Sequence, residues 1–335
     1  MKKITLRIVC LALAALIMLP MMAGCASSKK SSFSLPTRTL VPGEVKYFGS
    51  FGYRVYDDGS VAVVEYTGSE TRVTVPETIE GGRVIELGNE VFADNLTLQS
   101  VKMSSVEIIG HYAFYNCPSL SEVTLSKKLW SVGVAAFETT PWLATQTDEF
   151  VVVGDGVLLK YQGSDLYVVL PDNVKHLSNA FEINEQILGI ELGEQLLTIG
   201  ANAFAMCTAL RYVGFGSNIK LIGASAFDTC EMLTSIVIPD SVEVIGDYAF
   251  NYCTNMSEVK IGKSVRTIGD SAFRNCIRIK ILELPGTVES IGSYGFADCI
   301  VLTLVYYGGT PEQFEALGLD TTNYILRDVE KIYAQ

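Results

Sequence analysis

One sequence pattern recurs about every 23 residues through most of this chain. An Ala-Phe pair, or a close variant of it, marks each copy, and its phenylalanine falls at residues 92, 114, 137, 181, 204, 227, 250, 273 and 296. From Phe181 onward every step is 23 residues, whereas the earlier steps are 22, 23 and 44 residues. A fixed period of this length predicts a solenoid, in which each coil packs against its neighbours and the stacked coils share one core.

Residues 233–253 show the pattern within one copy. Residues 236–238 alternate apolar and variable positions, which predicts a short strand with one face inward. Pro, Gly or Ser follows this strand in each copy and breaks it. An Ile-Gly step comes next, where a residue without a side chain lets the chain bend again. The phenylalanine then fills the interior on the far side of the coil.

The combined pattern LxxLxLPxxLxxIGxxAFxxC resembles the BspA-like, or Treponema-type, leucine-rich repeat almost residue for residue. The resemblance covers residues 73–307, and it is specific because the repeat length, Pro, Ile-Gly, Ala-Phe and Cys all fall in register. It implies a curved, β-rich leucine-rich-repeat solenoid with a parallel sheet on its concave face and short capping elements. It also implies an extracellular protein with a binding or adhesion role.

The predicted leucine-rich-repeat domain spans residues 44–335. We expect an N-terminal cap hairpin within 44–72, repeats over 73–307 and a C-terminal cap at 308–335. Caps are required because the open end of a solenoid exposes unpaired strand edges. In the C-terminal cap, Thr310 followed by Pro311 predicts the start of a helix.

Residues 138–167 interrupt the repeats. This segment replaces part of one coil and holds two β-type runs around Gly154-Asp155-Gly156, a turn signal that predicts a hairpin insertion. The coil that ends at Phe181 has Leu177-Ser178 in place of Ile-Gly and is one residue short, so we expect local irregularity there.

Residues 1–24 are predicted to be a lipoprotein signal peptide. Three cations open the segment, and residues 8–28 carry no charge. The apolar run ends in Ala23-Gly24-Cys25, which resembles a lipobox, although Met22 stands at the usual Leu position. Cys25 would then be acylated and become the mature N-terminus. An ordinary cleaved signal and an uncleaved transmembrane anchor are the alternatives, and all three export the chain.

Residues 25–43 are expected to form the lipid anchor and a flexible tether, because this Ser-, Lys-, Thr- and Pro-rich stretch has no hydrophobic periodicity. The formal charge of the chain is −12, and residues 1–43 hold six cations and no acid, so residues 44–335 carry −18. Such an acidic body argues against nucleic acid and against direct adsorption to anionic lipid. Membrane contact is therefore expected through lipidated Cys25, at the bacterial cell surface.

Six cysteines form a ladder along the repeats, each three residues after a repeat phenylalanine. They are Cys117, Cys207, Cys230, Cys253, Cys276 and Cys299. Asn95, Thr140 and Asn184 take this place in other coils, and all these side chains can hydrogen-bond turn backbone. We predict a structural ladder of reduced thiols. Metal sites need clustered ligands, and stacked equivalents about 4.8 Å apart do not suit a disulfide, whose Cβ atoms lie about 3.8 Å apart. No metal and no cofactor is predicted.

Support for catalysis is weak. The two histidines, His111 and His176, fall in variable slots that we expect to face outward, and neither belongs to a nucleophile motif. The glycines follow the repeat, so they form no phosphate-binding loop. We predict that the protein is not an enzyme, and an unrecognised hydrolase remains the third hypothesis.

The leading hypothesis is a surface module that binds a protein or glycan ligand. The rival is a structural or assembly scaffold of the cell envelope. A ligand would contact the strand residues that face the concave side, because these positions vary while the core positions stay fixed. The candidates in the C-terminal half are Arg211, Tyr212, Lys260, Lys280, Glu283 and Tyr306. Tyr and Arg are the residue types that most often anchor interfaces.

Overall fold

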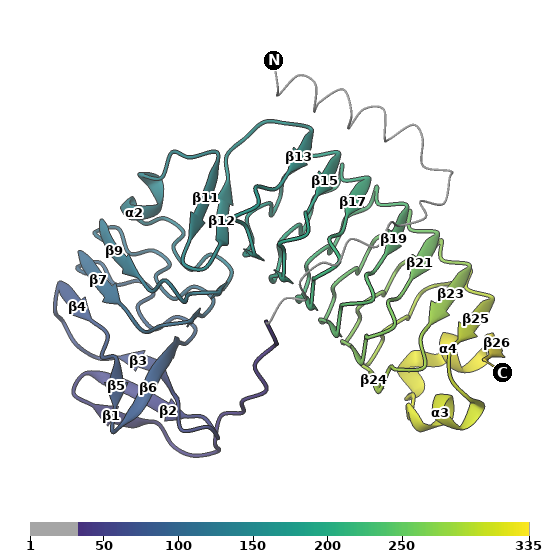
Figure 1. The fold of residues 1–335 in the computed structure, drawn as a ribbon, viewed down its shortest axis with the longest axis horizontal. Helices are drawn as coiled ribbons and strands as arrows, with labels where there is room; N and C mark the ends of the chain where they lie inside the picture. Colours follow the sequence, from purple (N-terminus) through teal and green to yellow (C-terminus); the bar gives the residue numbers. More distant parts are fainter. Residues whose placement is uncertain (1–32, 335) are drawn as a thin grey trace. The chain divides into compact units, whose positions relative to one another are not determined.

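Two lines of short parallel strands run through the described part of the chain. The computed structural model describes residues 33–334, and Figure 1 shows successive coils stacked side by side. Each regular coil adds one strand to each line. The solenoid predicted from the 23-residue period and the leucine-rich-repeat fold implied by the resemblance are therefore confirmed. The predicted signal peptide (residues 1–24) and Cys25 lie outside the described residues.

The first strand line is the one that the alternating residues predict. Its strands pair in parallel and make three sheets. The first sheet holds β4 (Arg72–Thr74), β7 (Ser100–Met103) and β9 (Glu122–Leu125). The second holds β13 (Tyr167–Val169), β15 (Gly189–Glu191) and β17 (Tyr212–Gly214). The third holds β19 (Ser235–Val237), β21 (Glu258–Lys260), β23 (Ile281–Leu284), β25 (Leu304–Tyr307) and β26 (Glu330–Tyr333). In β19 the central residue is buried and its two neighbours are exposed.

The second strand line lies at the Ile-Gly step, where the sequence predicted only a bend. We call the coils before the insertion at residues 138–167 the first block and those after it the second block. In the first block the line consists of β6 (Gly82–Leu87), β8 (Ile108–Ile109) and β10 (Ser131–Val132). In the second block it consists of β14 (His176–Leu177), β16 (Thr198–Ile199), β18 (Leu221–Ile222), β20 (Val244–Ile245), β22 (Thr267–Ile268) and β24 (Ser290–Ile291). Most of these strands have two residues, which is too short for any alternation to show in the sequence.

The repeat glycine is required by the close approach of neighbouring coils. A Cβ atom on Gly246 would lie 2.6 Å from the backbone nitrogen of Ala224 and 2.7 Å from the carbonyl carbon of Gly223. The obstructing atoms are backbone, so they cannot move aside without shifting a whole coil. The glycine therefore serves the packing of one coil on the next, in addition to the turn that follows it.

The far side of each coil turns through two residues in the left-handed region. In one coil these are Tyr248 (φ 57°) and Tyr252 (φ 55°), and equivalent residues recur along the stack. Their N–H groups donate to the next coil, from Tyr248 to Asp270 O (2.8 Å) and from Tyr252 to Arg274 O (2.9 Å). A left-handed non-glycine residue costs about 1 kcal/mol, and these bonds between coils help to offset that cost.

Stacked phenylalanines fill the interior beside these turns. The rings of consecutive coils from Phe181 to Phe296 have centroids 4.9 to 5.1 Å apart and interplanar angles of 3° to 16°. A second stack runs from Phe92 to Phe137. Tyr66 packs on the start of the first-block stack and Tyr161 on the start of the second-block stack, with centroids 4.7 and 5.0 Å from the first phenylalanine.

The predicted hairpin insertion separates the two stacks. Its strands β11 (Phe150–Val153) and β12 (Val157–Tyr161) pair antiparallel around residues 154–156, as predicted, and the short helix α2 (Pro141–Ala144) precedes them. Val157 belongs to the core of the first block, whereas Leu158 belongs to the core of the second. The insertion therefore divides the interior into two apolar cores.

Both ends of the stack are capped. At the N-terminal end, β1 (Lys46–Phe48), β2 (Phe51–Val55) and β3 (Val61–Tyr66) form an antiparallel sheet, and β5 (Thr78–Ile79) pairs with β6. At the C-terminal end, α3 (Pro311–Ala316) begins at Thr310 with the predicted N-cap, and η1 (Thr321–Asn323) and α4 (Tyr324–Asp328) follow. Phe314 of α3 is buried, and its ring lies 5.2 Å from that of Tyr307.

The segment expected to be a tether up to residue 43 is partly docked on the N-terminal cap. Leu40 forms a bridge with Tyr56, and Val41 N–H donates to Val55 O (2.9 Å). The guanidinium of Arg38 lies 3.8 Å from the carboxylate of Glu107. Leu40 packs on a small apolar cluster beside β3, which explains why this end of a polar stretch is held against the body.

Replacing a repeat glycine should damage the stack strongly. We expect Gly246→Ala to lower the free energy of unfolding by about 3 kcal/mol, because the added methyl group meets backbone of the previous coil. Gly43→Ala is the matched control, since a Cβ atom there meets nothing within 4 Å. Urea unfolding followed by circular dichroism measures both. Equal stability of the two variants would contradict the close-approach explanation.

Candidate binding surfaces

One row of exposed side chains crosses the third sheet of the first strand line. Val237, Lys260, Glu283, Tyr306 and Ile332 are successive cross-strand neighbours on β19, β21, β23, β25 and β26. All five side chains are exposed. We call this set the outer row. The structure thus brings three of the six predicted residues together in one line.

Lys280, a fourth predicted residue, is exposed immediately before β23, three residues ahead of Glu283 in the sequence, and does not belong to the outer row. Ile332 was not predicted, because β26 lies in the C-terminal cap and has no counterpart in the repeat pattern. Its pairing with β25 nevertheless extends the row by one strand.

Of the two remaining predicted residues, Tyr212 begins β17 in the second sheet and Arg211 immediately precedes that strand. The hydroxyl of Tyr212 donates to a carboxylate oxygen of Glu191 (2.8 Å). Tyr167 and Tyr212 flank Gly189 in register, and a Cβ atom on Gly189 would lie 3.0 Å from the first ring and 3.5 Å from the second. Tyr167 was missed because it falls at the end of the 138–167 insertion, where the period is lost.

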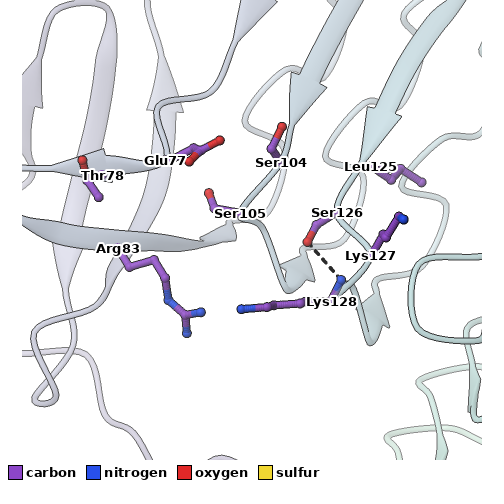
Figure 2. Close-up of a pocket in the computed structure, with 9 residues that line it drawn as sticks. All are labelled: Glu77, Thr78, Arg83, Ser104, Ser105, Leu125, Ser126, Lys127 and Lys128. Carbon is purple, nitrogen blue, oxygen red and sulfur yellow. Dashed lines mark hydrogen bonds between the residues drawn. The ribbon is translucent and has the colours of Figure 1, made fainter.

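A pocket of about 530 Å³ opens in the first block, where β7 and β9 end beside the turn between β5 and β6. Figure 2 shows the residues that line it: Glu77, Thr78, Arg83, Ser104, Ser105, Leu125, Ser126, Lys127 and Lys128. The Lys128 side chain extends toward the guanidinium of Arg83 across the mouth of the pocket (Figure 2). Three cations and one acid therefore line a pocket in an otherwise acidic protein.

The pocket lies where one coil is a residue short. Met103 precedes Val106 by three residues, whereas the equivalent Ile238 precedes Val242 by four. The missing residue accounts for the 22-residue step from Phe92 to Phe114, and it falls in the turn after β7. The turn that remains, Ser104-Ser105, forms one wall of the pocket. The 22-residue step is visible in the sequence. The repeat period alone does not show that the missing residue leaves a pocket, or on which surface that pocket lies.

In two of the longer turns a carboxylate at the corresponding position bonds to the next coil, whereas other regular coils have Lys127, Ser217, Lys263 or Gly286 there. Asp240 Oδ1 accepts the N–H of Lys263 in the next coil (2.9 Å), and Glu194 Oε2 accepts the N–H of Ser217 (3.0 Å). The short turn has Ser105 instead, and its hydroxyl oxygen is buried without a hydrogen-bond partner among residues 33–334. The short turn thus has an uncharged side chain where Asp240 and Glu194 supply a carboxylate in two of the regular coils.

The cations of the pocket differ in how they are held. Arg83 Nη2 lies 2.9 Å from Glu107 Oε1, in an ion pair whose acid is largely buried. In the described part of the chain no carboxylate forms an ion pair with Lys127 or Lys128. The backbone N–H of Lys128 donates to the hydroxyl of Ser126 (3.1 Å), which fixes the turn that carries both lysines.

The six ladder cysteines are buried and free of disulfides. Each thiol donates to the carbonyl of the phenylalanine in the preceding coil, over Sγ–O distances of 3.0 to 3.3 Å. Phe227 O, for example, accepts from the N–H of Cys230 in its own coil and from the thiol of Cys253 in the next. Burial raises the pKa of the Cys117 thiol to about 11 and those of Cys207 and Cys299 to about 12.

Asparagine replaces cysteine at the first coil of each block. Asn95 accepts from the N–H of Leu98 (2.9 Å) and Asn184 from that of Ile187 (3.1 Å). Each of these coils follows a tyrosine-bearing strand rather than a coil with a repeat phenylalanine. A thiol there would have no phenylalanine carbonyl to bond, whereas an asparagine can bond within its own turn.

His176 is buried in β14, which corrects the prediction that it faces outward. Its Nδ1 lies 2.9 Å from the hydroxyl of Thr198, and its ring packs 5.8 Å from that of Trp130. Burial lowers the pKa of His176 to about 4, so the ring is neutral at physiological pH. His111 Nδ1 accepts the N–H of Val134 (3.0 Å), a bond between coils. Both histidines thus make contacts that hold neighbouring coils together.

With these surfaces described, the comparisons with known proteins can be stated. The BspA type Leucine rich repeat region matches residues 69–149 and 175–303 in six copies. The chain belongs to this family. The unmatched residues 150–174 contain the insertion strands β11 and β12 and the following strand β13.

Solved structures of similar fold include three bacterial leucine-rich-repeat proteins. The pneumococcal vaccine antigen PcpA is 18% identical with a TM-score of 0.47, and the match covers 90% of this chain and 88% of PcpA. A leucine-rich cell surface protein from Faecalibacterium prausnitzii is 19% identical (TM-score 0.39, 84% and 99% covered). The T. pallidum leucine-rich-repeat protein is 23% identical (TM-score 0.29, 70% and 91% covered). None of the curated proteins compared with the chain matches it.

A smaller pocket of about 350 Å³ lies beside the insertion of this BspA-type solenoid, and Glu138 and Glu182 are among its lining residues. Both carboxylate oxygens of Glu182 accept hydrogen bonds, from the side-chain amides of Asn179 and Asn202 (2.8 Å each). Glu182 is thus engaged in holding two coils together. Within residues 33–334, no cluster of three or more His, Cys, Asp or Glu residues is placed to bind a metal ion, and no helix is long and apolar enough to cross a membrane.

The ladder thiols should react only after unfolding. We expect a thiol reagent such as Ellman's reagent to label six more cysteines per chain in denaturant than in the native protein, because burial hides the sulfur atoms and raises their pKa. Absorbance of the released thiolate measures the difference. Rapid labelling of these six residues in the native protein would rule out a buried structural role.

Proposed function

We propose that this protein is a surface-anchored module that binds a protein or glycan ligand through the outer faces of its first strand line. The outer row carries the proposal. Tyr306 and Ile332 are 43% and 45% exposed, and they lie beside the charged residues Lys260 and Glu283 on a sheet held by parallel pairing. Exposed apolar and aromatic side chains beside charges are typical of binding surfaces.

The fold supports binding more directly than catalysis. Each coil presents its outward residues at a fixed spacing of about 4.8 Å from those of its neighbours, so a ligand meets a preformed row. Such a surface costs little conformational entropy on binding. If the protein instead serves as an envelope scaffold, the same surface would hold another envelope protein and no external ligand would be found.

A glycan and protein array probed with the full chain in detergent tests the proposal. Once a ligand is identified, Tyr306→Ala or Tyr212→Ala should weaken its binding by more than about 1 kcal/mol while the melting temperature stays nearly unchanged. Tyr115→Ala is the matched control, because Tyr115 has the same 39% exposure as Tyr212 but lies outside the first strand line. If both variants bind normally and changes in residues 138–167 abolish binding, the ligand binds the insertion and the proposed site on the first strand line is wrong.

We infer that the protein is exported and held at the bacterial surface by lipidated Cys25. The uncharged run of residues 8–28 and its Ala23-Gly24-Cys25 ending support this. Leu40 docks on the N-terminal cap and Arg38 lies beside Glu107 of the repeats, so residues 26–37 would connect the lipid to the solenoid.

Mass spectrometry of the membrane fraction tests the anchor. We expect the mature chain to begin at an acylated Cys25, and Cys25→Ser to block lipidation and release of the signal peptide at this site. Cys10→Ser is the control, because Cys10 lies inside the apolar run and should be lost with the signal. Recovery of wild-type protein with an unmodified Cys25 would exclude the lipoprotein assignment.

A further inference from the structure

We propose that the pocket of the short coil binds the acidic group of a saccharide, either a carboxylate or a sulfate. The proposal deepens the binding function above, because it assigns a ligand class to a second surface. It rests on three observations: converging cations, an uncharged Ser105 where two other coils hold a carboxylate, and an acid on the opposite wall.

The cations come first. Lys128 extends toward the guanidinium of Arg83 although both side chains are positively charged (Figure 2). Arg83 is held in place by Glu107, and Lys128 makes no ion pair in the part of the chain that the structure describes. Two like charges that converge on one opening repel each other, and an anion between them removes that repulsion. A guanidinium also offers paired donors that suit the oxygens of a carboxylate or sulfate.

The second observation is the acid that this turn lacks. In regular coils Asp240 and Glu194 each accept a backbone N–H from the following coil. By sequence position the corresponding pair in the pocket is Ser105 and Lys127; the Ser105 side chain carries no charge, and its hydroxyl has no hydrogen-bond partner among residues 33–334. A bound carboxylate or sulfate would supply the oxygens that Asp240 and Glu194 supply elsewhere. An external anion would thus stand at the position that an internal carboxylate takes in those two coils.

The third observation concerns the rest of the ligand. Glu77, with Thr78, lines the wall opposite Lys127 (Figure 2). A carboxylate there accepts hydrogen bonds from hydroxyl groups and repels a second negative charge nearby. Thr78, Ser104 and Ser126 add hydroxyl groups to the lining. The pocket of about 530 Å³ is in the size range of small-molecule sites. Together these features favour one acidic group on a hydroxyl-rich ligand, which is the chemistry of an acidic sugar.

Isothermal titration of the full chain in detergent tests the proposal with four probes. These are a galacturonic acid tetramer, a sulfated galactose tetramer, a neutral galactose tetramer and inorganic sulfate. We expect at least one acidic tetramer to bind, the neutral tetramer to bind at least about 10-fold more weakly, and the affinity to fall as salt is added. Preference for one acidic tetramer over the other identifies the natural group.

Two matched pairs of variants locate the site. Lys128→Gln should weaken the acidic tetramer by about 10-fold or more, whereas Lys263→Gln, a turn lysine in a coil of regular length, should change its affinity less than about twofold. Ser105→Asp should abolish binding, because it places a carboxylate in the pocket. Ser105→Asn introduces an uncharged side chain of the same size as aspartate and should retain most of the binding. Unchanged melting temperatures show that the fold is intact.

The possible failures are distinguishable. If the neutral tetramer binds equally well, or if Lys128→Gln behaves like Lys263→Gln, the pocket does not bind the acidic group. If inorganic sulfate binds as tightly as the sulfated tetramer, the saccharide part is wrong. In each case a ligand whose binding depends on Tyr212 or Tyr306 would leave the proposed function intact. The absence of any array ligand, or normal binding of that ligand by both tyrosine variants, would contradict that function instead.

Discussion

The close spacing of successive coils is the constraint on which the rest of this structure depends. Stacked phenylalanine rings lie about 5 Å apart, close to the strand separation in a sheet. At that distance Gly246 has no room for a Cβ atom, and the turns must use left-handed residues so that Tyr248 and Tyr252 can donate to the next coil. The cysteine thiol also depends on this spacing. The phenylalanine carbonyl inside each coil has a second lone pair, and the thiol of the next coil is close enough to donate to it.

Outward positions escape this constraint, and they are where the protein can differ from its relatives. Tyr306 and Lys260 occupy equivalent positions in the row, yet one is aromatic and the other cationic, because both side chains are exposed and fill no space in the core. The pocket arises in another way. The loss of one residue beside Ser105 leaves the core positions Met103 and Val106 buried, so the coil stays in the stack while its turn becomes shallower. Binding features can therefore be added to this fold by substitution on the strands or by a length change in a turn.

The sequence predicts the elements whose pattern is long enough to repeat. Alternation gives the first strand line, and local turn and cap signals give the hairpin at 154–156 and the helix after Thr310. The second strand line escapes prediction because two residues such as Val244 and Ile245 cannot show a period. His176 was misplaced for a related reason. Its coil lacks the Ile-Gly step, and Trp130, which packs beside it, comes from a coil on the other side of the insertion.

The candidate sites divide in the same way. Lys260, Glu283 and Tyr306 could be grouped from the period, since each stands at the same place in consecutive coils. Ile332 could not, because β26 joins the sheet from outside the repeats. The pocket combines residues of three kinds: a regular turn at Lys127, a shortened turn at Ser105 and the hairpin residue Arg83. The pocket depends on how the shortened turn of one coil packs between the turns of the two neighbouring coils. That packing is a property of the assembled stack and cannot be read from one coil's sequence.

The insertion between the two cores has a consequence for how such a chain can change in length. Val157 is the last buried residue of the first core and Leu158 is the first buried residue of the second, so each block has its own beginning and end. A duplication or deletion of 23 residues in the second block would lengthen or shorten that stack by one layer and leave the first block untouched. The pocket lies in the first block and the outer row in the second. Gene rearrangement can therefore alter the distance between the two surfaces in steps of about 5 Å, one step for each coil added or removed.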